Sequence, residues 1–309
     1  MNIFLTGASG LVGGAFARAA ARRGHVVTGT VGQFPEAIEG LARQLTLDLS
    51  DEAALTTQVL ELFPEVIVNC AAISEPAQCE ADPARAQTLN VVLPSALAQL
   101  AHHVSARLIH LSSEQVFAGD RAPYGITAPP APLNLYGRQK LESERVVLRG
   151  APEFAAVVRA PLLGGNSPGG RRSLHERLFA DWAAGRVPRL YTDEIRQVCS
   201  AENLAEVLVE LCERPALLGV FHWAGAEGLS RYELGQRIRA HFKFTEAQAP
   251  LVAVSRADDP AVAAKRQADL RLDLAPLAGT LKTQPETFAQ QLEQLVIPPP
   301  CRAWYLALT

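Results

Sequence analysis

The segment at residues 3–24 constrains the fold more than any other part of the chain. A short apolar run at residues 3–5 is followed by a glycine-containing turn and then by a helical pattern over residues 11–23, which Gly24 ends. Gly7, Gly10 and Gly13 form a G-x-x-G-x-x-G pattern in the turn. The order predicts a buried strand, a tight turn and a helix whose N-terminus faces the pyrophosphate of a dinucleotide.

Each glycine has a physical role in this prediction. Gly7 lets the chain turn sharply, Gly10 lets backbone N–H groups approach a pyrophosphate, and Gly13 lets the helix pack closely on the strand. Negative charge on the ligand is favoured there because the helix N-terminus carries a partial positive charge.

The ends of the next two strands should indicate which nicotinamide cofactor binds. Residues 25–30 read as the second strand, but neither an acidic residue for NAD nor an arginine for NADP follows it. The choice between NAD and NADP therefore stays open. Residues 45–47 read as a third strand, and Asp48 after it fits either a contact with adenine or a charge flanking the helix that Ser50 opens.

Strands and helices alternate through residue 160. Further apolar runs at residues 66–68, 108–111 and 155–158 read as strands, and residues 84–102 read as one long helix that contains Asn90 and has a kink or boundary at Pro94. This alternation predicts a Rossmann-like, doubly wound parallel sheet of the α/β class.

After Arg159 the sequence becomes rich in glycine and then in arginine. We predict an NAD(P)-binding domain at residues 1–160, with residues 198–224 returning to it, and a smaller C-terminal substrate-binding lobe from residues 161–197 and 225–309. Helical patterns occur at residues 200–212, 232–242 and 286–295, and residues 298–309 are read as a tail that cannot continue a helix. The arginines of this half fit either substrate phosphates or a solvated basic face: Arg171, Arg172, Arg177, Arg186, Arg189 and Arg196.

Tyr136 and Lys140 are the candidate acid–base pair. They lie four residues apart in a segment that Asn134 is expected to cap and Gly150 to end, so both side chains should project from one helix face. A nearby ammonium favours the phenolate, which would bring the tyrosine toward acid–base chemistry near neutral pH. The alternative is a chance pairing on an amphipathic helix.

Composition excludes several other classes of function. The 309 residues carry a net charge of −3, so no basic excess indicates nucleic acid or an anionic membrane. The five cysteines are scattered and suggest neither a disulfide framework nor a metal site. The N-terminus lacks the pattern of a signal peptide, and no run of 18 apolar residues occurs. We therefore expect a soluble, cytoplasmic protein with a small-molecule substrate and no metal.

Four segments together resemble the extended short-chain dehydrogenase/reductase family over essentially the whole chain. They are the glycine turn at residues 6–13, the Asn-Cys-Ala-Ala turn at residues 69–72, the Leu-Ser-Ser strand end at residues 111–113 and the Tyr-x-x-x-Lys pair. Residues 110–117 and 132–137 are most similar to the dTDP-4-dehydrorhamnose reductase branch. That branch also includes the non-catalytic regulatory subunit of methionine adenosyltransferase.

The resemblance implies a set of site residues. Ser113, Tyr136 and Lys140 would be the catalytic triad of a reductase that uses NADP or NAD to reduce a keto group, with a nucleotide-linked sugar as the expected substrate. The implied cofactor contacts are Gly7, Ser9, Gly10, Leu11, Val12, Asp48, Leu49, Ala71, Ala72, Ile73, Tyr136 and Lys140, and the implied substrate contacts are Ser113, Glu114, Leu162 and Arg196. A homodimer through the Tyr136 helix is common in the wider family and is left open here.

Two departures from the branch leave alternatives. Ser113-Glu114-Gln115 stands where rhamnose-forming relatives have Thr-Asp-Tyr, and Leu162 lies in a segment that usually carries a tryptophan over the substrate. Reduction of another keto sugar is therefore the first hypothesis. An epimerase that retains NAD and a non-catalytic NAD(P)-binding regulatory protein are the alternatives, whereas dehydration is disfavoured because Gln115 replaces a carboxyl group with an amide.

Overall fold

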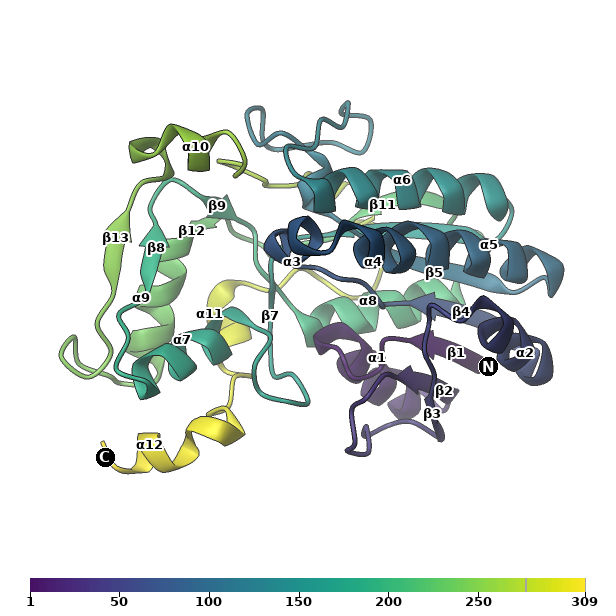
Figure 1. Cartoon of the computed structure of the whole chain (residues 1–309), viewed down its shortest axis with the longest axis horizontal. Helices are drawn as coiled ribbons and strands as arrows, with labels where there is room; N and C mark the ends of the chain where they lie inside the picture. The colour runs from purple at the N-terminus through teal and green to yellow at the C-terminus, as the bar shows by residue number, and fades with distance from the viewer. Residues whose placement is uncertain (276, 309) are drawn as a thin grey trace.

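A seven-stranded parallel sheet organises the computed structural model, which describes residues 1–275 and 277–308. The strand order is β11-β6-β5-β4-β1-β2-β3. The sheet strands are β1 (Asn2–Thr6), β2 (Val26–Val31), β3 (Arg43–Thr46), β4 (Val66–Asn69), β5 (Arg107–Ser113), β6 (Ala155–Ala160) and β11 (Gly219–His222). The order reverses direction between β1 and β4, which is where ligands bind in sheets of this type. The predicted fold class is confirmed (Figure 1).

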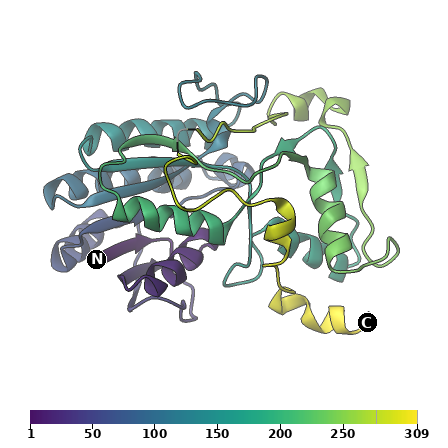
Figure 2. The same ribbon diagram turned by 180° about the vertical axis from the view of Figure 1, so that it is seen from behind.

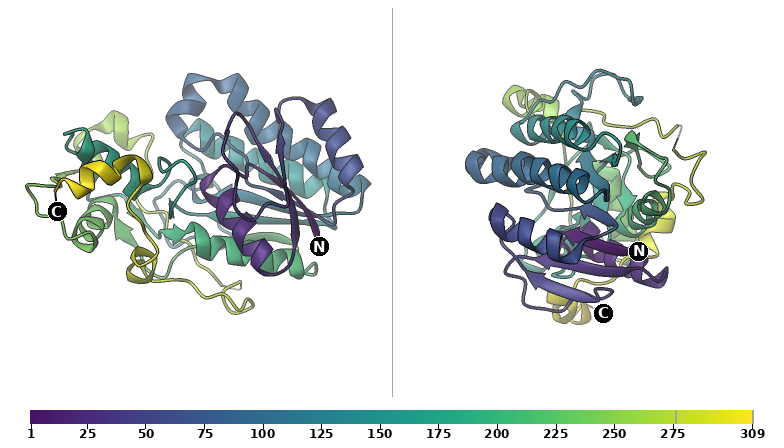
Figure 3. Two further views of the ribbon diagram at one scale, coloured as in Figure 1. Left: turned by 90° about the horizontal axis from the view of Figure 1, so that it is seen from below. Right: turned by 90° about the vertical axis from the view of Figure 1, so that its right-hand side faces the viewer.

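Helices cover both faces of the sheet because successive strand residues point to opposite faces and both sets are apolar. Ile3 and Leu5 pack on one side with α1 (Leu11–Arg22) and α8 (Ala201–Glu213), whereas Phe4 packs on the other. The second side is covered by α2 (Glu52–Leu62), α5 (Leu93–His103) and α6 (Leu135–Gly150). Figure 3, seen from the right-hand side, shows the resulting three layers.

The remaining elements lie at the carboxyl ends of the strands or beside the sheet. Between β4 and α5 are α3 (Pro76–Ala81), α4 (Pro83–Gln87) and a π-helical turn, Thr88–Val92; a 3₁₀ turn, Glu114–Val116, follows β5. The rest are β7 (Leu163–Gly164), α7 (Leu174–Ala183), β8 (Arg189–Tyr191), β9 (Ile195–Arg196), β10 (Cys199–Ser200), β12 (Leu229–Ser230), α9 (Arg231–His241), β13 (Val252–Val254), α10 (Pro260–Ala263), α11 (Phe288–Leu292) and α12 (Arg302–Leu306), with 3₁₀ turns at Arg256–Asp258 and Pro299–Cys301.

A separate hydrophobic cluster holds α7, α9, α11 and α12 together, and we call these elements and the short strands between them the second lobe. Phe179 lies at its centre, in edge contact with Phe242 and Phe244. Figure 2 shows this lobe beside the sheet, at the end away from the N-terminus. The strand predicted to return to the sheet does so as β11, which pairs with β6, while the exact division into domains stays a prediction.

Several predicted element ends were wrong. Asp51, not Ser50, caps α2, because its carboxylate accepts from the Ala54 N–H while the Ser50 hydroxyl donates to Asp48. The helix predicted at residues 286–295 is only Phe288–Leu292. The tail does not continue α11, as predicted, but a further helix that was not predicted, α12, begins after its prolines, and Trp304 packs on Phe244. Helix α7 was not predicted at all; its capping box, Ser173 with Glu176, was the available signal.

Among the described residues, no helix combines the length and the apolar composition that a membrane crossing requires.

A buried ion pair fastens α6 to the sheet. Glu144 of α6 accepts two hydrogen bonds from Arg159 of β6, at 2.9 and 2.7 Å, and both side chains are almost fully enclosed. The Ser112 hydroxyl of β5 donates to the same carboxylate at 2.5 Å. Because Glu144 lies one turn beyond Lys140, this contact fixes the half of α6 that carries the amine.

Breaking this pair from one side should be far more damaging than removing it. We expect Arg159→Leu, which leaves the Glu144 carboxylate buried and unpaired, to lower the free energy of unfolding by about 3–5 kcal/mol. Arg159→Leu combined with Glu144→Leu should cost less than the single change. The exposed pair Arg237–Glu227, 3.1 Å apart, is the control, and Arg237→Gln should cost at most about 1 kcal/mol. Equilibrium urea unfolding measures all three, and an equal loss in the single and double variants would contradict the expectation.

Candidate functional site

The glycine turn between β1 and α1 is built for close approach. Gly7 has φ +73, and a Cβ there would lie 2.8 Å from the Ala71 nitrogen; a Cβ on Gly13 would lie 2.2 Å from the Gly7 oxygen. Gly10 is the N-cap residue of α1, and no side chain caps the helix. Its first N–H groups therefore lack a side-chain acceptor, which fits an incoming pyrophosphate. Ser9, Gly10, Leu11 and Val12 occupy this helix start, as predicted from the sequence.

Residues 71–73 form the opposite wall of the turn and are held by an unpredicted residue, Asn90. The Asn90 side chain accepts from the Ile73 N–H at 2.9 Å and donates to the Ile73 oxygen at 3.0 Å, and it also donates to Gln139 of α6. Asn90 is fully buried in the π-helical turn. A polar side chain inside an otherwise apolar helix was the sequence signal. The loop at residues 71–73 is thereby fixed, with Ala71 against Gly7 of the turn and Ile73 packed near Tyr136.

The N-terminus of α6 packs directly on the end of β5. A Cβ on Gly137 would lie 2.2 Å from the Gln115 oxygen, so only glycine permits this approach. Asn134 caps α6 by accepting from the Gly137 N–H at 2.8 Å, as predicted, and its amide nitrogen donates to Gln115 Oε1 at 3.0 Å. Gln115, considered before only as a departure from the branch, thus holds the helix start beside Ser113.

This packing brings the phenol of Tyr136 close to the hydroxyl of Ser113, a polar contact that favours the phenolate. Both side chains are buried. Burial raises the pKa of Tyr136 to about 12, although the contact with Ser113 acts in the opposite direction. The phenol therefore keeps its proton at neutral pH, which is the form that can protonate a substrate oxygen.

Lys140 does not lower the phenol pKa in this structure, contrary to the prediction from the sequence. Its side chain is fully buried, and burial lowers the pKa of the amine to about 8, while Glu144 acts to raise it. Nζ lies 3.4 Å from His110 Nε2. Desolvation is the largest effect on the pKa of both groups, so the phenol and the amine are shifted toward their neutral forms.

Glu114 joins the triad to the second lobe. Its carboxylate lies 3.4 Å from Arg196 Nε and near the Leu162 N–H, both of which act to lower its pKa, and Oε2 has no hydrogen-bond partner among the described residues. Burial raises the pKa of Glu114 to about 7. Arg196 is otherwise occupied, because its guanidinium donates to the main-chain oxygens of residues 195, 267 and 268. The four predicted substrate residues, Ser113, Glu114, Leu162 and Arg196, are thus brought together, with Arg196 supporting Glu114.

The adenine end is less defined. Asp48 is exposed and accepts from the backbone N–H and the hydroxyl of Ser50, which lower its pKa. Leu49 packs against the core beneath it. The other predicted arginines do not form one cluster: Arg177 pairs with Glu75, and Arg186 pairs with Asp181.

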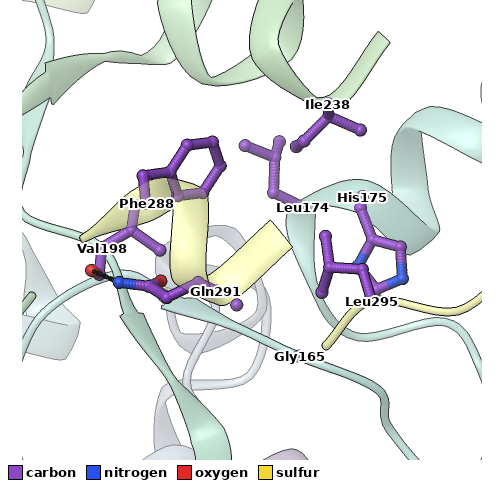
Figure 4. Close-up of a pocket in the computed structure, with 9 residues that line it drawn as sticks. Gly165, Leu174, His175, Val198, Ile238, Phe288, Gln291 and Leu295 are labelled. Carbon is purple, nitrogen blue, oxygen red and sulfur yellow. Dashed lines mark hydrogen bonds between the residues drawn. The ribbon is translucent and has the colours of Figure 1, made fainter. Parts of the chain in front are cut away.

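A cavity in the second lobe is a poor alternative site. It is lined mainly by apolar side chains such as Leu174, Ile238 and Phe288 (Figure 4). Gln291 donates to the Val198 oxygen and leaves its own oxygen without a partner among the described residues. The space admits about one water molecule. Among the described residues no group of three or more histidine, cysteine or acidic side chains could hold a metal.

Comparison with known proteins extends the resemblance. The model of the family described as RmlD substrate binding domain matches residues 1–298. Methionine adenosyltransferase 2 subunit beta of Xenopus laevis is 34% identical over 75% of this chain and 69% of that protein. A probable dTDP-4,6-dihydroxy-2-methyloxan-3-one 4-ketoreductase of Streptomyces antibioticus is 31% identical over 77% of this chain and 76% of that protein.

Solved structures agree with the fold. A hypothetical dTDP-4-dehydrorhamnose reductase from Sulfolobus tokodaii superimposes with a TM-score of 0.81 and 26% identity, covering 96% of this chain and all (100%) of the other. The dTDP-4-dehydrorhamnose reductase from Bacillus anthracis, solved in complex with NADP, superimposes with a TM-score of 0.79 and 21% identity. The match covers 94% of this chain and 96% of the other. These similarities confirm the predicted resemblance and fold class.

The buried amine of Lys140 should leave a signature in stability. Below pH 8 the amine is charged in both the folded and the unfolded states. Between pH 8 and 10.5 the folded state loses its proton first, so the unfolded state binds more protons and stability rises with pH. A shift from 10.5 to about 8 corresponds to on the order of 3 kcal/mol. We therefore expect Lys140→Met to be more stable than the wild type at pH 7.

The advantage of Lys140→Met should shrink by on the order of 2–3 kcal/mol between pH 7 and pH 10. Urea unfolding of the two ligand-free proteins at several pH values measures the difference, in which the contributions of shared tyrosines and thiols cancel. A difference that does not change with pH would contradict the expected charge burial.

Proposed function

The chain belongs to the family of the RmlD substrate binding domain, and on this premise we propose that it reduces the keto group of a nucleotide-linked sugar with Ser113, Tyr136 and Lys140 as its catalytic residues. The family match and the ketoreductase relative confirm the class of activity predicted from the sequence, an NAD(P)-dependent reductase of the dTDP-4-dehydrorhamnose reductase type. The observation that carries the residue assignment is the burial of Ser113 and Tyr136 in contact with each other, one helical turn from a buried amine.

The residues present fit a nicotinamide dinucleotide. The cofactor's pyrophosphate would meet the uncapped start of α1, and residues 71–73 would line its inner side. Both cofactor types occur among structures of this fold, with NADP in the Bacillus anthracis reductase and NAD in a protein solved with UDP-glucose. The 2′ preference stays undecided, because Gln33 and Phe34 follow β2 where an acidic residue or an arginine would discriminate.

The proton chemistry follows from the protonation states. When bound, NAD(P)H supplies a hydride to the carbonyl carbon. Tyr136, neutral at physiological pH, donates its proton to the carbonyl oxygen as negative charge develops there, and Ser113 donates a hydrogen bond to the same oxygen. Lys140 provides a positive charge or an amine behind the phenol, depending on pH, because its pKa is about 8.

Substrate recognition is proposed to centre on Glu114. Its free oxygen, adjacent to Ser113, is placed to accept from a hydroxyl next to the reacting carbonyl. Leu162 and Arg196 hold that carboxyl in place. Since Glu114 stands where rhamnose-forming relatives have aspartate, we propose a substrate that differs from dTDP-4-dehydrorhamnose around the reacting carbon. A homodimer and a cytoplasmic location stay predictions.

A second candidate function has a specific observation in its favour. The Xenopus laevis relative at 34% identity is named as a subunit of methionine adenosyltransferase, so a role as a dinucleotide-binding partner of another enzyme is the competing proposal. The two functions share the fold and the cofactor site. They differ in whether Tyr136 is needed.

Substitution of the phenol separates them. We expect Tyr136→Phe to lower kcat for keto-sugar reduction by about 10²–10⁴-fold while the affinity for NADPH or NADH changes by less than about threefold, because the ring remains. Initial-rate kinetics and cofactor fluorescence titration measure the two effects. Arg138→Gln is the matched control. Arg138 lies two residues from Tyr136 on the exposed side of α6, so this variant should keep full activity.

Equal turnover in wild type and Tyr136→Phe would refute the assignment. If wild-type protein oxidises neither cofactor with a panel of nucleotide-linked keto sugars yet co-purifies with a methionine adenosyltransferase, the second function replaces the first.

A further inference from the structure

A continuous chain of buried hydrogen bonds runs from the glycine turn toward Lys140. It begins with Asn69 at the end of β4, whose Oδ1 accepts from the Thr6 hydroxyl at 2.7 Å and from the Ala71 N–H at 3.2 Å. A backbone N–H can only donate, so the oxygen of the Asn69 amide must face Ala71. The amide nitrogen therefore points the other way, toward His110 Nδ1 at 3.1 Å.

This arrangement fixes the tautomer of His110. Because Nδ1 accepts from Asn69, the ring proton lies on Nε2. Nε2 donates to the Ser143 hydroxyl at 2.9 Å, and that hydroxyl donates to the main-chain oxygen of Lys140 at 2.7 Å. His110 is fully buried, and its pKa lies well below the usual value because of burial and the nearby Lys140. The imidazole is therefore neutral.

The amine of Lys140 meets the protonated side of this ring. Nζ lies 3.4 Å from Nε2, whose single proton is donated to Ser143. The ring therefore offers an ammonium no acceptor at Nε2, whereas a neutral amine can turn its lone pair toward the positive N–H edge of the ring. The other titratable groups around the amine are Cys70 at the end of β4 and, on α6 itself, Glu144 and Tyr136. Glu144 favours the ammonium; His110, whose Nε2 offers the ammonium no acceptor, is the neighbour that favours the neutral form.

We propose that His110 is a positioning residue that fixes Lys140 beside the phenol and favours its uncharged form. The chain from Thr6 through Asn69 to His110 ties this effect to the turn that receives the dinucleotide. The proposal rests on the proposed function only in giving Lys140 a catalytic role; the effect of His110 on the amine is a property of the protein without substrate.

The chain contains four lysines, at positions 140, 243, 265 and 282, so the amine can be titrated directly by NMR of protein labelled with ¹⁵N at lysine Nζ. Lys140→Arg identifies the Lys140 signal by its loss. His110→Asn keeps an acceptor for Asn69 but does not reach Ser143 and Lys140, whereas His110→Gln keeps a donor at the position of Nε2. His175→Gln is the control, because His175 is equally buried with two hydrogen bonds but lies in the second lobe.

In wild type the Lys140 signal should titrate below the other three. We expect His110→Asn to raise its midpoint by about one pH unit, His110→Gln to restore most of the wild-type value, and His175→Gln to leave it unchanged. Ser143→Ala tests the contact between His110 and Lys140 in the other direction. It removes the acceptor of the Nε2 proton, which can then be donated to the neutral amine, so the midpoint of Lys140 should fall. Ser143→Ala also serves if His110→Asn does not fold.

An unchanged midpoint in folded His110→Asn, or in Ser143→Ala if that is the variant that folds, would overturn the proposal. So would an equal shift in His175→Gln. The titration needs no turnover, so inactivity of the wild type would refute the proposed function without touching this result. Where turnover occurs, the pH dependence of kcat should shift with the NMR midpoint while KM for the keto sugar stays within about twofold.

Discussion

The contact between Gly137 and the Gln115 carbonyl is the constraint on which the site depends. The phenol can reach Ser113 only if the first turn of α6 lies against the chain that leaves β5, and any side chain at position 137 would keep the two apart. Asn134 caps the helix and bonds Gln115 at the same time. The geometry of the proposed catalytic residues is therefore a consequence of backbone packing, because their side chains are carried on surfaces that cannot separate without losing buried hydrogen bonds.

This packing buries several ionisable side chains, which costs free energy, and some of them are better paired than others. Glu144 and Arg159 are joined by a two-bond ion pair. Lys140 and Glu114 lack such complete pairing, and burial moves the pKa values of both toward neutral pH. Groups that titrate near neutrality beside a neutral phenol are what proton transfer requires. The fully paired side chains, Glu144 and Arg159, stabilise the fold, whereas the incompletely paired ones, Lys140 and Glu114, belong to the proposed catalytic site.

The sequence predicted the parts of this structure that depend on local pattern. The glycine turn, the alternation of strands and helices, and the cap at Asn134 each follow from backbone conformation or period. What it could not predict depends on contacts between distant segments: the hold of Asn90 on Ile73, the chain from Asn69 to His110, and the direction of the Tyr136 shift. The last error is instructive, because a four-residue spacing indicates that two groups are near but not how far burial removes them from water. The element ends were missed where several capping residues compete, as at Ser50 and Asp51.

The geometry of the site also explains why a reductase and a non-catalytic subunit of this family are hard to tell apart. A dinucleotide site and a capped α6 are needed to fold and to bind the cofactor, so they would persist in a binding protein as well as in an enzyme. The oxygen of Glu114 is different. It is buried beside the triad, has no partner among the described residues, and adds nothing to the stability of the fold, because an unpaired buried oxygen costs free energy. We propose that this cost is offset when the substrate binds, with a substrate hydroxyl beside Ser113 donating to the free oxygen. For this reason the carboxyl of Glu114, more than the triad itself, favours turnover over a purely structural use of the site.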